Sequence, residues 1–395
     1  MSRSRRVADT SVTQRAVKLR LYPTNKQAEL LKVNFDAARF IWNKLLSDSM
    51  DYYFATDSFH VPYPASYKKA FPWLRQADSL ALSNVRLNLM KSYSCFFNAV
   101  NAKKSGSKKK FKNCGKPQFK SKKRCRPSYT TNNQHGTVAF DGKYVRLPKV
   151  GYIKVGGERF IDPEWRLKNA TVAQSKSGKY FISIIYEFDT PNFSTNVDFN
   201  NALGLDYSSP HFYVDSEGRE ADYPRYYRLG EVKLAKLQRR VSKKTLGSKN
   251  REKAKRKLTK FSEHIANQRK DFCQKLSNEI TNHYDIICVE DLNMQNMARA
   301  LRLGKSTNDN GFGEFRRMLQ YKCKDKGKFF VTIDKWFPST KTCFDCGYVL
   351  PQIGKGVKEW TCPHCGKFHN RDHNAAKNIK RKGTEELMLK LSSVA

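Results

Sequence analysis

Acidic residues and long apolar runs are the two things this chain has least of. Aspartate and glutamate number 36 against 75 lysines and arginines. No apolar run approaches the roughly 20 residues that a membrane-spanning helix needs. The opening stretch, MSRSRRVADTSVTQR, is basic but has no apolar core, so we expect no secretory signal. The lack of long apolar runs and of a signal predicts no membrane-spanning segment, and we expect no membrane partner.

The charge imbalance indicates a polyanionic partner instead. The formal net charge is +39 over 395 residues, a length that allows two or three domains. A folded protein with this charge repels itself unless a polyanion neutralises it. Aromatic residues make up 12% of the chain, which is enough apolar material for a core and excludes a disordered basic protein. A long nucleic acid is the leading interpretation, and an anionic membrane surface is the weaker alternative.

Four of the ten cysteines form two C-x-x-C pairs, and this usage favours metal binding over a disulfide framework. Fifteen residues separate the pairs, and a glycine follows each one, which permits the tight turn of a zinc knuckle. Two histidines, His364 and His369, are alternative ligands, although four thiolates already complete a closed, structural site. The predicted zinc ligands are Cys343, Cys346, Cys362 and Cys365. We therefore expect a reducing, cytoplasmic location, with the chemistry elsewhere in the chain.

The first half of the chain predicts strands interrupted by helices. AVKLRLY (16–22) is β-type, and Thr24 with Gln27 forms a capping box for the helix that follows. A second helical block covers about 66–100, and a basic strip (103–126) is either a phosphate-tracking surface or a solvated loop. Residues 128–188 predict further strands, with hairpin tips at Asp141-Gly142 and Ser177-Gly178. This order suggests a barrel with a helical insertion.

The second half predicts a mixed sheet. ALGLDY, YDIICVED and KFFVTID are short apolar runs typical of buried strands. Between the first two, residues 228–282 are helical and heavily basic, with a break near 245–250, which predicts a long helical hairpin.

Three acids are candidates for catalysis. Asp206 and Glu290 end buried strands, and Asp372 begins a predicted helix after the second cysteine pair. Carboxylates that meet at a sheet edge suit Mg²⁺, and two such ions can drive phosphodiester hydrolysis. Each acid taken alone could instead be a helix cap or a surface ion pair. Three nearby acids compete for the role: Asp215, Asp285 and Asp291.

The ordered motifs resemble the TnpB family of transposon-encoded RNA-guided nucleases, which is related to miniature type V CRISPR effectors. The resemblance is carried by GLDYSSPHFYVDSEG, CVEDLNM, FPSTKTCFDCG and CPHCGKFHNRDHNAAKNI, and it extends to KLRLYPTNKQAELL and FGEFRRMLQYKCKDKG. It implies a multidomain α+β protein: a wedge-type β-barrel with an inserted helical recognition domain, then a RuvC-like RNase H fold interrupted by a Cys₄ zinc ribbon. The implied domains are the barrel (1–23 and 106–195), the recognition domain (24–105), the nuclease (196–336 and 370–395) and the ribbon (337–369).

The resemblance also implies a function. It assigns the nuclease triad to Asp206, Glu290 and Asp372, with two Mg²⁺ ions that Mn²⁺ can replace, one structural Zn²⁺ and a guide RNA that selects double-stranded DNA beside a short flanking motif. We expect a monomer within its ribonucleoprotein, working on the nucleoid of a bacterial or archaeal cell. The rivals are a CRISPR-associated effector, a binding-only regulator and a strand-transferring transposase. His369, Asn370 and His373 are candidates for supporting the triad or starting the helix. The expected nucleic-acid contacts are Lys108, Lys109, Lys110, Thr130, Thr131, Asn132, Lys341 and Trp360. Trp360 could equally belong to a small packing core.

Overall fold

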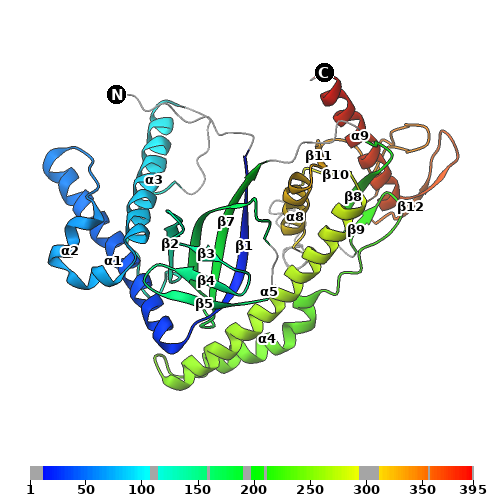
Figure 1. The fold of residues 1–395 in the computed structure, drawn as a ribbon. Helices are drawn as coiled ribbons and strands as arrows, with labels where there is room; N and C mark the ends of the chain where they lie inside the picture. Colours follow the sequence, from blue (N-terminus) through cyan, green and yellow to red (C-terminus); the bar gives the residue numbers. More distant parts are fainter. Residues whose placement is uncertain are drawn as a thin grey trace. The chain divides into compact units, whose positions relative to one another are not determined.

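The structure is a computed structural model that describes residues 12–106, 114–157, 161–189, 197–208, 211–292, 311–354 and 356–393. The chain divides into two compact units, 1–189 and 190–395, each with its own core. Their helices and strands are drawn in Figure 1. None of the helices in the described ranges combines the length and apolar character needed to cross a bilayer.

Unit 1 (residues 1–189) is built on a curled antiparallel sheet. Its described strands are β1 (Val12–Tyr22), β2 (Ser128–Asn132), β3 (Ala139–Phe140), β4 (Tyr144–Leu147), β5 (Gly151–Gly156), β6 (Arg166–Gln174) and β7 (Tyr180–Asp189). They pair in the order β2-β6-β7-β1-β5-β4-β3. The long β1 pairs with β7 along most of its length and with β5 at its last residues. Both hairpin tips predicted from Asp-Gly and Ser-Gly lie in turns, β3–β4 and β6–β7.

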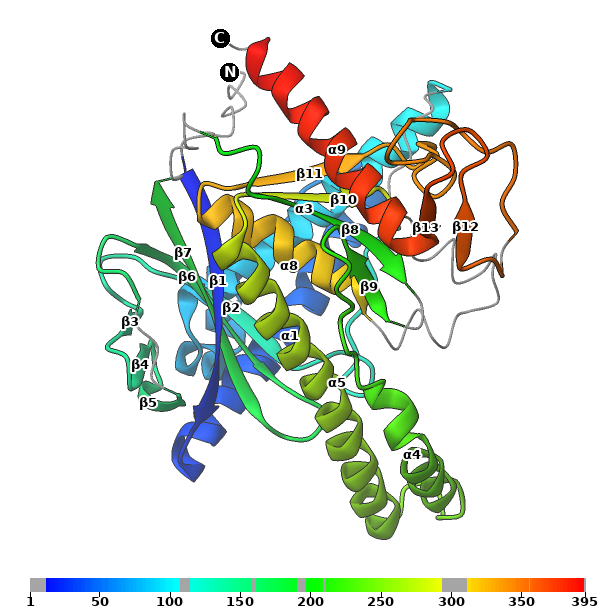
Figure 2. The same ribbon diagram turned by 90° about the vertical axis from the view of Figure 1, so that its right-hand side faces the viewer.

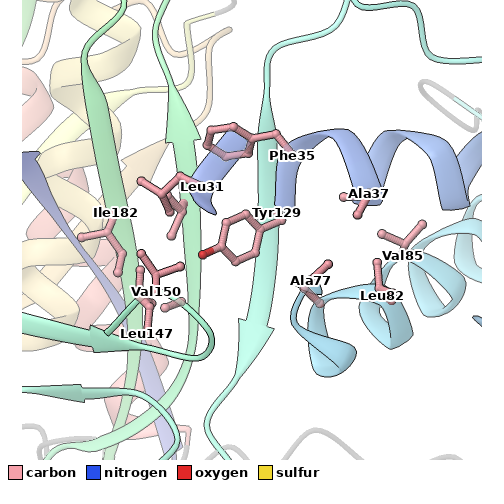
Figure 3. Packing of buried hydrophobic residues seen from close by; sticks show 14 of the residues in the cluster. Leu31, Phe35, Ala37, Ala77, Leu82, Val85, Tyr129, Leu147, Val150 and Ile182 are labelled. Carbon is pink, nitrogen blue, oxygen red and sulfur yellow. The ribbon is translucent and has the colours of Figure 1, made fainter. Parts of the chain in front are cut away.

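Helices fill the interval between β1 and β2, as the sequence predicts. They are α1 (Asn25–Thr56), α2 (Tyr67–Ala70) and α3 (Ser79–Lys104), with 3₁₀ turns at Pro64–Ser66 and Pro72–Gln76. The Thr24–Gln27 capping box is present at the start of α1. Tyr129 of β2 points into the shared core, near Leu31, Phe35 and Val150 (Figure 3). Cys95 of α3 and Cys114 form a disulfide bond that the cysteine spacing does not predict.

Unit 2 (residues 190–395) contains a mixed sheet with the order β11-β10-β8-β9. β8 (Ala202–Ser208), β10 (Ile286–Glu290) and β11 (Phe329–Ile333) are parallel, and β9 (Phe212–Asp215) is antiparallel to β8. The predicted basic hairpin is α4 (Tyr226–Ser242) and α5 (Lys249–His283). The ribbon contains β12 (Glu359–Thr361) and β13 (Phe368–Asn370).

Helices cover both faces of this sheet (Figure 2). On one face, α5 and α8 (Phe312–Asp325) enclose a core that includes Leu203, Leu205 and Val289. On the other face, α9 (Arg371–Ser392) packs on Ala202, Ile286 and Cys288. Alternation along each strand therefore sends even-numbered residues of β8 and β10 toward α9 and odd-numbered ones toward α5 and α8.

Candidate functional site

Two of the three candidate acids occupy equivalent places on neighbouring parallel strands. Leu205 of β8 is in register with Val289 of β10. Asp206 and Glu290 are the next residues of their strands, at the carboxyl edge of the sheet. Both are even-numbered, so the pleat directs them toward the face that α9 covers. Parallel pairing alone thus brings two carboxylates side by side.

Close packing of α9 brings the third acid to the same edge. A Cβ at Gly204 would lie 2.2 Å from the Ala376 carbonyl oxygen, and a Cβ at Gly383 would lie 2.4 Å from Cys288 Sγ. Two glycines thus let the helix backbone touch β8 and β10 directly. Asp372 is one turn before Ala376 on the same helix face, just as Asp206 is one pleat beyond Gly204. The helix therefore begins over the two strand acids.

The charges of the other two acids act on Asp206. Burial raises the pKa of Asp206 well above its ordinary value, and the negative charges of Glu290 and Asp372 raise it further. Arg371 acts in the opposite direction, and it donates to Asp372 at 2.9 Å. Burial also raises the pKa of Glu290, while a hydrogen bond donated by the Ser339 hydroxyl lowers it. This cluster is electrostatically costly without a cation.

Each competing acid has a basic partner of its own. Asp215 is buried and pairs with Arg219 at 2.8 Å. Asp285 pairs with Lys328 at 3.0 Å, and Asp291 pairs with Arg316 at 2.7 Å. Among the candidate acids, Arg371 pairs with Asp372 at 2.9 Å and its charge also lowers the pKa of Asp206. The carboxylates of the three candidate acids therefore suit a hard divalent cation better than those of the competing acids. Its carboxylates do not all lie within 4.8 Å of one another.

The four cysteines of the ribbon converge as the spacing predicts. Their sulfurs all lie within 4.8 Å of one another, with 3.6 Å between Cys343 and Cys365 and between Cys346 and Cys362. The glycines after the pairs, Gly347 and Gly366, have φ of 78° and 72°, the left-handed conformation that glycine adopts without strain. Four sulfurs at this separation fit one tetrahedral Zn²⁺ ion.

The histidine and asparagine candidates divide between two places. His369 belongs to the ribbon, where its Nε2 lies 3.1 Å from Cys343 Sγ and 3.7 Å from Asp345 Oδ2. These three residues form a second set with ligand atoms within 4.8 Å. Asn370 caps α9 by accepting the His373 backbone N–H, which is the helix-start role. The His373 ring contacts the Ser216 carbonyl at 3.2 Å.

Two of the expected nucleic-acid contacts are buried instead. Trp360 packs in the ribbon core, 4.7 Å from the His369 ring, so its face is not available to a base. Thr131 is fully buried, because alternation in β2 turns Tyr129 and Thr131 inward. The same alternation leaves Thr130 and Asn132 on the other face of the strand. The sequence suggests Thr131 as a contact because it is polar and Trp360 because it is aromatic, and neither property reports burial.

The remaining predicted contacts are partly exposed or lie outside the described residues. Thr130 and Asn132 are linked by Asn84 of α3, whose amide donates to the Thr130 carbonyl at 2.9 Å and to Asn132 Oδ1 at 3.2 Å. A cavity of about 340 Å³ opens beside them, lined also by Arg39, Lys120 and Arg126. Lys341 donates to the Pro351 carbonyl at 2.9 Å. Lys108, Lys109 and Lys110 lie outside the described residues.

The α4–α5 hairpin presents a strongly basic surface. Gly230 of α4 faces Ile265 of α5, and Leu234 is buried in the helix pair. The cationic side chains therefore point outward. The exposed ones include Arg228, Lys233, Lys236, Arg239, Arg240, Lys243, Lys244, Lys249, Lys253, Lys255, Arg256, Lys257 and Lys260.

Sequence reasoning missed two residues near the acids. Trp336 is 79% exposed, and Lys335 Nζ lies 4.7 Å from the centre of its ring. It follows β11, whose Ile333 pairs with Glu290, and its backbone N–H is held by Asp334 at 2.7 Å. Ser339 is buried and donates to Glu290. A tryptophan directly after a lysine is a possible signal in the sequence, but nothing in the sequence distinguishes Ser339 from any other serine.

Comparisons with known proteins agree with this organisation. A family described as "Cas12f1-like, TNB domain" matches residues 312–379, one described as "Probable transposase" matches residues 183–301, and one described as "Helix-turn-helix domain" matches residues 11–57. The last range forms β1 and one long helix in this chain. The Cas12f1 chain of a Cas12f1–sgRNA–target DNA complex has a TM-score of 0.58 at 11% identity, covering 94% of this chain and 99% of that one. The protein therefore has a Cas12-like mixed α+β fold.

Sequence relatives place the chain more narrowly. A Streptomyces pristinaespiralis protein named "Putative RNA-guided DNA endonuclease" is 32% identical over 386 residues, which are 94% of this chain and 89% of the relative. An Escherichia coli K12 protein named "Putative RNA-guided DNA endonuclease InsQ" is 27% identical, covering 93% and 92%. At this identity over nearly the full length, the chain belongs to the TnpB family.

Proposed function

We propose that this protein is an RNA-guided DNA endonuclease that cuts target DNA beside a short flanking motif. One observation carries the proposal: Asp206, Glu290 and Asp372 meet at one sheet edge. At this edge the positive charge of Arg371 lowers the pKa of Asp206. Family membership supports the same activity, since the relatives above are named as RNA-guided DNA endonucleases.

The domain assignment follows from this activity. Unit 2 would be a RuvC-like nuclease with the RNase H fold, formed by 196–336 and 370–395 and interrupted by the zinc ribbon at 337–369. The curled sheet of unit 1 would be the wedge domain (1–23 and 106–195), with α1 to α3 as the inserted recognition domain (24–105). The parallel core with α9 on one face and α5 and α8 on the other supports the nuclease part.

The triad would hold two Mg²⁺ ions, which Mn²⁺ can replace, through its carboxylate oxygens. The bound ions supply an activated water and stabilise the leaving oxygen of the phosphodiester. The protein's own groups act by placement. Packing at Gly204 fixes the height of α9 over the strands, Arg371 orients the Asp372 carboxylate, and Ser339 orients Glu290.

The partners are a guide RNA and double-stranded target DNA. The α4–α5 hairpin presents the charge that tracking phosphates requires. Base pairing with the guide would select the target, and the protein would read the flanking motif. Trp336 replaces Trp360 as the candidate stacking residue for an unpaired strand, since its ring is exposed and stands beside the Glu290 end of the sheet. We expect a monomer in the ribonucleoprotein, acting on the nucleoid.

The test is guide-dependent plasmid cleavage, with RNA loading and DNA binding measured on the same samples. The guide is first identified by sequencing RNA that co-purifies with the protein. Asp206→Ala, Glu290→Ala and Asp372→Ala should each abolish cutting and leave binding intact, and the triple variant should be scarcely worse than a single one. Asp291→Ala, next to Glu290 but paired with Arg316, is the control that should still cut. Guided binding without cutting by the parent would indicate a regulator, and joining of transposon ends without RNA would indicate a transposase.

A further inference from the structure

Ser339 connects the zinc ribbon to the candidate nuclease acids. It lies between β11 and the first cysteine pair, its side chain is 3% exposed, and its hydroxyl donates to Glu290 Oε1. Its own carbonyl accepts from the Asn378 amide of α9 at 2.9 Å. A buried hydroxyl with one bond to a candidate metal ligand and a backbone held by a neighbouring helix has little freedom to move.

We propose that Ser339 is a positioning residue that fixes the Glu290 carboxylate for cation binding, and that the folded ribbon holds Ser339 in place. The inference rests on the proposed nuclease function. It adds that the acid site depends on the ribbon. Ser339 lies 49 residues after Glu290 in the chain.

The link through α9 consists of two asparagines one turn apart. The Asn378 amide also donates to the Thr342 carbonyl at 2.6 Å, and the Asn374 amide donates to the same carbonyl at 2.8 Å. The Asn374 side-chain oxygen accepts the Phe344 backbone N–H at 3.0 Å. Both asparagine side chains are buried. Breaking these bonds would leave buried polar groups unpaired, which is destabilising.

The residues that these asparagines hold are the first residues of the ribbon. Thr342 precedes the first zinc ligand, and Phe344 follows it. The backbone N–H of Cys343 donates to the Tyr348 carbonyl at 2.8 Å, which closes the first knuckle. The conformation of 342–344 is therefore set by the knuckle, and structural zinc sites fold only with their metal. Loss of the zinc would release the acceptors that Asn374 and Asn378 bind.

The same helix carries Asp372 on its other side. Asp372 and Ala376 face the sheet, whereas Asn374 and Asn378 face the start of the ribbon. Helix α9 thus carries Asp372 itself and also holds Ser339, which donates a hydrogen bond to Glu290. Outer-shell partners of metal ligands commonly change metal affinity by about 10- to 100-fold when removed, so the effect is measurable.

The experiment measures Mn²⁺ binding by electron paramagnetic resonance in the full RNA-loaded protein, with cleavage recorded against Mg²⁺ concentration. Ser339→Ala should weaken Mn²⁺ binding about tenfold and raise the Mg²⁺ needed for half-maximal cutting, with cutting largely restored at saturating Mg²⁺. Thr340→Ala removes the adjacent hydroxyl and is the control that should match the parent. Zinc content by elemental analysis and thermal unfolding show that each variant is folded.

A shape-matched pair isolates the hydroxyl if alanine disturbs packing. Ser339→Thr keeps the donor and should bind Mn²⁺ better than Ser339→Val, which has the same shape without it. Cys346→Ser should lose zinc and weaken Mn²⁺ binding together, while RNA loading persists. Equal binding by Ala, Val and parent proteins would overturn the role of Ser339, as would a loss shared equally by Thr and Val. Normal Mn²⁺ binding in zinc-free protein would overturn the ribbon link. A parent that neither binds Mn²⁺ nor cuts would instead refute the proposed function.

Discussion

Gly204 in β8 faces the carbonyl oxygen of Ala376 in α9 at a separation that only glycine permits. A Cβ there would lie 2.2 Å from that oxygen and 2.7 Å from the Lys380 backbone nitrogen. The obstructing atoms are backbone, so no side-chain rotation can relieve the clash. This contact sets where α9 crosses the sheet and, through the helix, where Asp372 meets Asp206.

Gly204→Ala should therefore displace α9 and destroy the acid cluster. Overpacking a core typically costs about 1–3 kcal/mol of folding free energy, and the helix shift should abolish guided cleavage even where the fold survives. Gly356→Ala is the control, because a Cβ at Gly356 meets nothing within 4 Å. Thermal unfolding and plasmid cleavage measure the two effects. A fully active, equally stable Gly204→Ala protein would contradict the packing that places Asp372.

The buried charge of Asp206 should make the cation-free protein less stable at neutral pH. Its folded pKa is raised, first by burial and then by Glu290 and Asp372. For an acid with a raised folded pKa, stability is fully present below the unfolded value of about 3.9 and falls as pH rises through the folded value. Asp206→Asn should thus melt above the parent at pH 7 in buffer without added Mg²⁺, by roughly 2–4 °C per kcal/mol gained, and the gap should close toward pH 4.

The matched control for that measurement is Asp291→Asn. Its carboxylate pairs with Arg316 at 2.7 Å, so neutralising it should bring no gain in melting temperature. Mg²⁺ should stabilise the parent, because a cation bound only to the folded state raises its stability, and it should stabilise Asp206→Asn far less. A parent protein whose melting temperature ignores both pH and Mg²⁺ would mean that the three acids are not a cation site.

The outward face of β2 should govern the preferred flanking motif. Thr130→Ala with Asn132→Ala should change the preference in a randomised-motif cleavage library and spare guide binding, since Thr130 and Asn84 line the cavity in unit 1 and Asn84 donates to Asn132. Thr131→Val should leave the preference unchanged and should not lower stability, because the Thr131 hydroxyl is buried without a hydrogen-bond partner. An identical motif for the double variant and the parent would exclude this strand as the reader.

The sequence predicted the elements whose signals are local. Apolar runs ending in Asp206 and Glu290 predicted strands, and C-x-x-C spacing predicted the four-sulfur cluster that the structure contains. Contacts between distant segments could not be predicted in this way. The role of Ser339 depends on Asn378 and Glu290, far away in the chain, and the Cys95–Cys114 disulfide has no motif.

The sequence also could not predict which of two chemically similar side chains is buried. After Tyr129, the stretch TTNNQ (130–134) is polar throughout, so it contains no hydrophobic alternation to show that Thr131 faces inward. Trp336 follows Lys335 and Trp360 lies two residues after Lys358, so both are close to basic residues in the sequence, and only the ribbon fold buries one of them.

These two tryptophans should give opposite results when replaced. Trp336→Ala removes an exposed ring beside the Glu290 end of the sheet and should weaken binding of the unpaired strand, since stacking contributes about 1–3 kcal/mol per base. Expressed as kinetics, KM for a single-stranded substrate should rise while kcat changes little, and Trp336→Phe should keep most of the function. Trp360→Ala should instead destabilise the ribbon by about 3–5 kcal/mol and lower its zinc content.

A 2-aminopurine base placed along the strand reports stacking directly, in a complex made cleavage-deficient by Asp206→Ala. Its fluorescence should be quenched at one position by the parent ring and recover in Trp336→Ala. Phe368→Ala removes another exposed ring of the ribbon region, 65% accessible, and should leave the quenching intact. Recovery in both variants would show a general apolar surface, and recovery in neither would mean that Trp336 does not stack on the strand.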